Sequence, residues 1–175
     1  MASKNTPNVV KGDIMIISEL SKHLKYSASE RKFLIRLAKK GVVAVESMLE
    51  EAIAKVGKIK RSQADGEDFE NGDDAKKAIV NLHTHGPIRS HSREASIGNL
   101  SRKRGNLLVM IAEPENNQLF YFKIPHYEYK TQKTITFQFN KDGGMNTKFM
   151  KGTNSQSWRI WNQYRVMSFK ELTGS

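Results

Sequence analysis

Acidic side chains are concentrated in one stretch of an otherwise basic chain. Six of the 18 Asp and Glu residues lie within the ten positions Asp65–Asp74, which contain no Lys or Arg, and Ala75-Lys76-Lys77 follows directly. The other 12 acidic residues share the rest of the chain with all 29 Lys and Arg. Carboxylates repel a phosphodiester unless a hard divalent cation, which prefers oxygen ligands, lies between them. The contrast therefore indicates a metal-dependent enzyme that acts on nucleic acid.

The acidic stretch has the pattern of a β-hairpin. Strands are predicted over Glu67–Glu70 and Asp74–Asn81, joined by a tight turn at Asn71-Gly72-Asp73. Side chains alternate in direction along a strand, so Asp74 and Lys76 are expected on one face. That face is the candidate site.

The length of the turn decides which second carboxylate joins Asp74. A three-residue turn pairs Asp68 with Lys76 and places both on the candidate face. A two-residue turn moves Asp68 to the other face and leaves Asp65 as its substitute. Asp68 and Asp74 are thus the candidate metal ligands, for Mg²⁺ or Mn²⁺. The Lys76 ammonium would orient a water or offset charge on the scissile phosphate.

The arrangement resembles the PD-(D/E)XK nuclease superfamily, whose signature is an Asp at the end of one strand and an Asp/Glu-x-Lys triplet on the next. The resemblance spans roughly residues 40–125 and matches Asp68 to the lone aspartate and Asp74-Ala75-Lys76 to the triplet. An acidic residue on a preceding helix often joins such sites. Glu46, at the edge of a core-facing stripe, matches that residue best.

The resemblance implies a restriction-endonuclease-like core. It also implies a metal-dependent endonuclease that hydrolyses phosphodiester bonds of DNA, restriction-like or phage-encoded. Double-stranded DNA is the expected partner, although no motif separates DNA from RNA or indicates a recognition sequence. Nuclease folds of this size often act as dimers, so a homodimer is expected by analogy.

A polar and basic segment follows the acidic stretch. Guanidinium groups suit phosphate oxygens and guanine edges, and imidazoles beside them can add contacts to phosphates or bases. The candidate nucleic-acid-binding residues are His83, His85, Arg89, His91, Arg93, Arg102, Lys103 and Arg104.

Two other functions compete with the nuclease. In the first, the chain is a non-catalytic nucleic-acid-binding protein and the acidic stretch is an exposed loop. In the second, His83 and His85 at a strand end bind zinc, as at the start of a JAMM/MPN+ metalloprotease motif. That motif needs a following Asp as third ligand, and no Asp occurs between Asp74 and Asp142.

The periodicity of the chain predicts an α+β fold in which N-terminal helices pack on a central mixed β-sheet. Three helices are expected, the first beginning near Asp13, the second after a capping box at Ser27–Glu30, and the third ending at Gly57. Trp161 is expected in the core. Strands are predicted over Leu107–Ile111, Gln118–Ile124 and Thr134–Phe139, the first two as a hairpin across Glu115-Asn116-Asn117, with a short helix near Glu94–Arg102.

Composition limits the setting. One domain is expected over residues 1–175, with a helical part at 1–57, the sheet and site at 58–140, and a C-terminal loop and aromatic segment at 141–175. A net charge of +11 and a pI near 9.8 favour nucleic acid as partner. The absence of cysteine, of a long apolar run and of a signal-peptide pattern predicts a cytoplasmic protein that does not enter a membrane.

Overall fold

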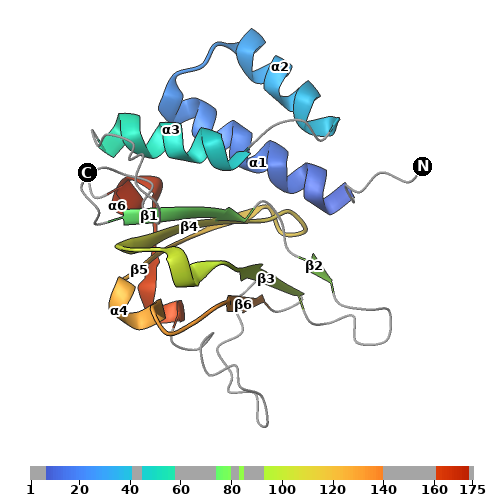
Figure 1. Cartoon of the computed structure of the whole chain (residues 1–175). Helices are drawn as coiled ribbons and strands as arrows, with labels where there is room; N and C mark the ends of the chain where they lie inside the picture. Colours follow the sequence, from blue (N-terminus) through green and yellow to red (C-terminus); the bar gives the residue numbers. More distant parts are fainter. Residues whose placement is uncertain are drawn as a thin grey trace.

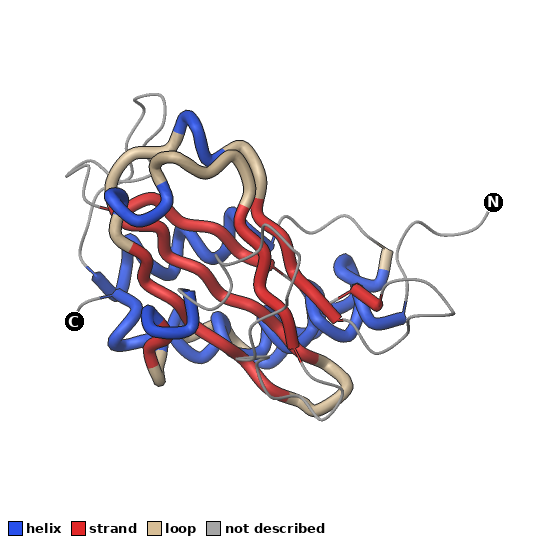
Figure 2. Tube along the Cα trace, turned by 90° about the horizontal axis from the view of Figure 1, so that it is seen from below, coloured by secondary structure: helices blue, strands red, loops and turns tan. Residues whose placement is uncertain are grey.

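The computed structural model describes residues 7–40, 45–57, 74–79, 83–84, 93–139 and 161–173, with the backbone alone at 7–10, 74–79, 83–84, 93–94, 138–139 and 162. Helices form an upper layer over a four-stranded sheet, and a second sheet lies beneath it (Figure 1). Seen from below, the strands cross in front of the helices (Figure 2). The expected α+β fold with N-terminal helices on a sheet is confirmed.

Three helices make the upper layer: α1 over Pro7–Leu24, α2 over Ala28–Lys39 and α3 over Val45–Gly57. The capping box is confirmed, because the Glu30 amide donates to the Ser27 hydroxyl and the Ser27 amide donates to the Glu30 carboxylate, each at 3.2 Å. α1 begins six residues before the predicted Asp13, at a proline that suits the first turn of a helix.

The central sheet is mixed. Its strand order is β1-β4-β5-β7, in which β1 and β4 are parallel and the other pairs are antiparallel. The predicted hairpin of Leu107–Ile111 with Gln118–Ile124 is confirmed by the antiparallel pair β4–β5. The strands are β1 (Asp74–Ile79), β4 (Asn106–Glu113), β5 (Gln118–Ile124) and β7 (Arg165–Val166).

The lower sheet contains a strand at a place where the sequence predicted a helix. Its strands are β2 (His83–Thr84), β3 (Arg93–Ile97) and β6 (Ile135–Phe139), in the order β2-β3-β6. The helix predicted near Glu94–Arg102 is a strand followed by a single 3-10 turn, η1 (Leu100–Arg102). Ala95 and Ile97 alternate with polar neighbours and are buried against β6, so pairing with a distant strand outweighs any local helical tendency.

β4 separates two apolar cores. Leu108 and Met110 pack with the helices above, whereas Leu107 and Val109 pack with the lower sheet, and all four are fully buried. The expected burial of Trp161 is confirmed, since its side chain is 1% exposed in the lower core.

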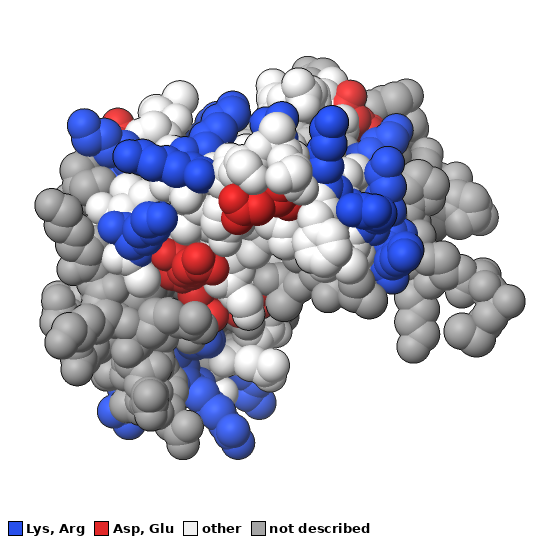
Figure 3. Space-filling model, turned by 90° about the horizontal axis from the view of Figure 1, so that it is seen from above, with Lys and Arg blue, Asp and Glu red and all other residues white. Residues whose placement is uncertain are grey.

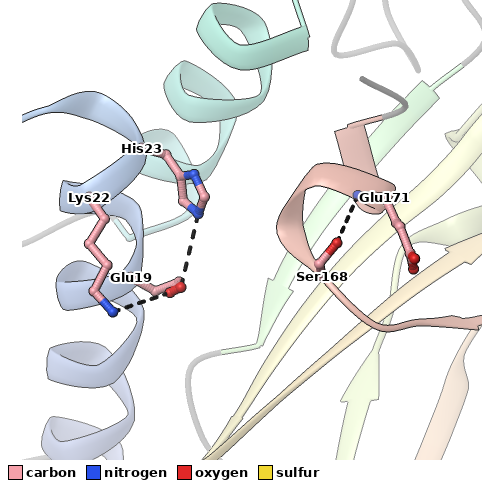
Figure 4. A network of polar contacts seen from close by, with 5 residues as sticks. All are labelled: Glu19, Lys22, His23, Ser168 and Glu171. Atoms are coloured by element: carbon pink, nitrogen blue, oxygen red, sulfur yellow. Dashed lines mark hydrogen bonds and ion pairs between the residues drawn. The ribbon is translucent and has the colours of Figure 1, made fainter.

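A short C-terminal helix, α6 (Phe169–Thr173), closes the upper core against α1. The Phe169 ring stacks on His23 with 4.2 Å between ring centroids. Figure 4 shows the polar groups around this contact, in which Glu19 lies 3.8 Å from the Lys22 ammonium and 4.0 Å from His23. Among the described residues no helix is both long and apolar enough to cross a membrane.

Asp13 makes stability depend on pH. Its side chain is buried on the core side of α1, and burial raises the pKa of the carboxyl from 3.8 to about 6. The folded state therefore holds the proton more tightly than the unfolded state, and stability is lost as pH rises from about 4 through 6. Asp13→Asn should leave the free energy of unfolding nearly unchanged at pH 4 and raise it at pH 8 by up to about 3 kcal/mol. Urea unfolding at both pH values measures this, and an equal effect at the two would contradict it.

Candidate metal and nucleic-acid site

The pairing of β1 with β4 brings the end of the acidic stretch to a basic turn. In this parallel pair Asp74 lies opposite Asn106, so both strands begin at the same edge of the sheet. The basic turn consists of Arg102, Lys103 and Arg104, which come just before Gly105 and Asn106 along the chain. We call this end of the sheet, made by Asp74, Arg102–Asn106 and Ile124–Tyr129, the Asn106 edge.

The basic turn is fixed by buried neighbours. The hydroxyl of Tyr129, a fully buried residue of α4 (His126–Tyr129), donates to the Gly105 carbonyl at 2.6 Å. Gly105 has a φ of 71°, which a side chain would strain. The buried Leu100 holds the other side, because its amide donates to the Lys133 carbonyl at 3.3 Å. A rigid turn of this kind can present cations at defined positions.

Arg102 and Arg104 are exposed, and Lys103 is half-buried. No ion pair joins Arg102 or Arg104 to any residue in the described part of the chain. Their guanidinium groups are therefore available to phosphate oxygens, which they can bind through two parallel hydrogen bonds.

The register also assigns the two faces of β1. Positions 76 and 78 pair with Leu108 and Met110, which belong to the upper core, so positions 74, 76 and 78 lie on the helix-facing side of the sheet. Asp74 and Lys76 therefore occupy the same face of a strand, as predicted. The hairpin partner, with Asp65 and Asp68, lies outside the described residues.

The metal-ligand set stays a prediction. Asp68 is outside the described residues, and only the backbone of Asp74 is described. Within the described ranges no group of three or more His, Asp or Glu side chains is placed to hold a metal ion. The donor type still fits, since Asp68 and Asp74 would offer the carboxylate oxygens that Mg²⁺ and Mn²⁺ prefer.

Glu46 does not lie at the Asn106 edge. It is in the first turn of α3, and α3 packs on β1 with the opposite chain direction (Figure 1). The first turn of α3 is therefore over the end of β1, whereas Asp74 is at its start. About 16 Å of helix, at 1.5 Å per residue, separates Glu46 from Gly57, the last residue of α3.

The predicted nucleic-acid-binding residues divide between two ends of the molecule. His83 pairs with Glu94, and Arg93 begins β3, which then runs toward η1. Arg93 and His83 thus lie at the end of β3 that is farther from the basic turn. Arg102, Lys103 and Arg104 lie at the Asn106 edge, and His85, Arg89 and His91 are outside the described residues.

α4 adds candidate residues that were not predicted from the sequence. Tyr127 is 67% exposed, and the adjacent Tyr129 supports the basic turn. α4 also contacts Tyr164, since burial and a hydrogen bond to Glu128 of this helix raise the pKa of the Tyr164 hydroxyl. The signal was present in the sequence, because Pro125 precedes a run in which aromatic and ionisable residues alternate. Exposed aromatic side chains on basic proteins can stack nucleic-acid bases, so Tyr127 is a further candidate contact.

The hydrogen bond from Tyr129 to Gly105 can be tested directly. Tyr129→Phe removes the donor and leaves the Gly105 carbonyl short of a partner, so we expect a loss of about 1 kcal/mol in the free energy of unfolding. Tyr127→Phe, at an exposed position of the same helix, should change it by less than about 0.5 kcal/mol. Urea unfolding of both variants gives the comparison, and equal effects would show that the bond does not brace the turn.

Known proteins do not indicate a function for this chain. No family model matches the chain, and neither the curated proteins nor the solved structures give a match to it. The functional assignment therefore depends on the residues and their placement.

Proposed function

We propose that the chain is a metal-dependent nuclease that hydrolyses phosphodiester bonds of DNA, with its site at the Asn106 edge. The observation that supports this most is the parallel register, in which Asp74 begins β1 beside the turn that carries Arg102 and Arg104. The sequence resemblance to the PD-(D/E)XK superfamily, with a restriction-endonuclease-like core, agrees with this placement.

Each part of the site has a role in the proposal. Asp74 and Asp68 hold Mg²⁺ or Mn²⁺, which when bound supplies Lewis-acid activation of a water and neutralises charge on the phosphate. Lys76, on the same face as Asp74, hydrogen-bonds the attacking water or the phosphate oxygens. The water oxygen forms a bond to phosphorus and passes a proton to solvent. The bond from phosphorus to the leaving sugar oxygen breaks, and that oxygen takes a proton from solvent to become a hydroxyl.

The basic turn holds the substrate. Arg102 and Arg104 bind phosphates that flank the scissile bond, and the brace from Tyr129 keeps them at a fixed distance from the start of β1. Accurate positioning of this kind accounts for much of the rate enhancement in phosphoryl transfer. Without a cation the neighbouring carboxylates would repel the same strand.

Asp74→Asn tests catalysis. The wild-type chain should cut plasmid DNA when Mg²⁺ or Mn²⁺ is added, and the variant, which loses one charged metal ligand, should be slower by about 100-fold or more. Binding to DNA in Ca²⁺ should be retained, because the variant leaves all the Lys and Arg side chains that contact phosphates in place. Gel analysis of nicked and linear plasmid measures the rate.

Glu115→Gln is the matched control, since Glu115 is an exposed carboxylate in the turn between β4 and β5, at the other end of the sheet. It should cut at the wild-type rate. A wild-type chain that binds but never cuts plasmid, single-stranded DNA or RNA with either metal would favour the non-catalytic binding protein instead. Stoichiometric zinc in the purified chain would favour the hydrolase with His83 and His85.

The double variant Arg102→Gln/Arg104→Gln tests substrate holding. Removal of one arginine–phosphate interaction should reduce the slope of log affinity against log salt by about 0.9, so the slope should become shallower by up to about 1.8. The control Lys11→Gln/Lys170→Gln removes the same charge from exposed positions on α1 and α6. Fluorescence anisotropy with duplex DNA in Ca²⁺ over a salt series measures both. Equal changes of slope in the two double variants would mean that DNA binding depends on net charge alone and not on Arg102 and Arg104.

A further inference from the structure

The outer surface of α2 is strongly basic. Lys32, Arg36, Lys39 and Lys40 are all exposed, and we call them, with the exposed Phe33, the α2 basic face. The only acidic residue of α2 is Glu30, and its carboxylate accepts a hydrogen bond from the Ser27 amide in the capping box. The α2 basic face therefore has no acidic neighbour within its own helix.

Helical geometry points this face away from the protein. Ala38 is fully buried, and Leu34 and Ile35 pack against the upper core. With 3.6 residues per turn, Lys32, Arg36 and Lys40 lie on the opposite side of the helix. α2 packs on α1 and is the outermost helix in Figure 1. Figure 3 views the molecule from this side and shows Lys and Arg side chains at both ends of the face.

Folding gains little from this arrangement. Lys32 and Arg36 are four residues apart, as are Arg36 and Lys40, and like charges at this spacing destabilise a helix by about 0.2–0.5 kcal/mol per pair. Lys39 and Lys40 are favoured by the partial negative charge of the helix end, but Lys32 is too far from that end to gain from it. The repulsion and the helix-end attraction are of similar size. Folding therefore gains little from four cations on one face, and binding is the better explanation for them.

The side chains of the α2 basic face indicate what kind of partner it binds. Four exposed cations match a polyanion. The Arg36 guanidinium lies 5.6 Å from the centre of the Phe33 ring, and a guanidinium on an aromatic ring is a combination that also contacts nucleic acid. A membrane fits less well, because Phe33 is the single large apolar side chain on the face, whereas Leu34, Ile35 and Ala38 pack against the core.

We infer that the α2 basic face is a second, sequence-independent contact for the phosphate backbone of nucleic acid. It is separate from the Asn106 edge, which lies at the sheet below, near the start of β1 (Figure 1). The inference depends on the proposed nucleic-acid substrate but not on catalysis. Substrate held at α2 would be anchored away from the bond that is cut.

The test is the salt dependence of duplex DNA binding in Ca²⁺. The variant Lys32→Gln/Arg36→Gln/Lys39→Gln/Lys40→Gln should make the slope of log affinity against log salt shallower by up to about 3.6. It should fold normally, because it also removes the like-charge pairs, and urea unfolding checks this. The control Lys11→Gln/Lys22→Gln/Lys55→Gln/Lys170→Gln removes the same net charge from exposed positions outside α2 and should change the slope much less.

The outcomes separate this inference from the proposed function. An unchanged slope in the α2 variant, with a changed slope in Arg102→Gln/Arg104→Gln, would overturn the second contact alone. Equal changes in the α2 variant and its control would overturn it as well. If the wild-type chain binds vesicles of anionic lipid more strongly than DNA, the partner of the α2 basic face is a membrane and the inference is wrong. A wild-type chain that binds neither duplex nor single strand would overturn both proposals.

Discussion

The burial of β4 on both faces is the constraint on which the rest of the structure depends. From Leu107 to Ala112 every side chain is fully buried, alternately in the core beneath the helices and in the core above the lower sheet. A slip of one residue would exchange the two sets of side chains, so the register of β4 with its neighbours is strongly fixed. Because β1 pairs in parallel with β4, the same constraint sets Asp74 opposite Asn106. The position of the proposed site is thus a consequence of how the core packs.

Positive and negative side chains are separated on the surface more than folding requires. Arg102, Arg104 and the α2 basic face expose cations that form no ion pair with the described residues, and the acidic stretch ends beside the basic turn. Surfaces of a protein selected for stability alone would mix the two signs. The separation is understandable if a polyanion binds to the cationic surfaces and a divalent cation joins it to the carboxylates.

Local signals in the sequence predicted much of the fold. The capping box at Ser27, the β4–β5 hairpin and the strand ending at Phe139 depend on neighbouring residues and are confirmed. β3 was missed because its partner β6 is about forty residues away, and no local pattern reports such a pairing. The approach of Asp74 to the basic turn was likewise hidden, since it follows from the parallel β1–β4 pair. The α2 basic face was missed because exposed charges leave no packing periodicity.

The most direct measurement is the anomalous scattering of Mn²⁺ in crystals of the chain soaked with that ion. We expect one strong peak at the Asn106 edge, in contact with the Asp74 carboxylate and a second carboxylate from the acidic stretch. Soaked crystals with a peak elsewhere, or with none at that edge, would contradict a metal-dependent site at the start of β1.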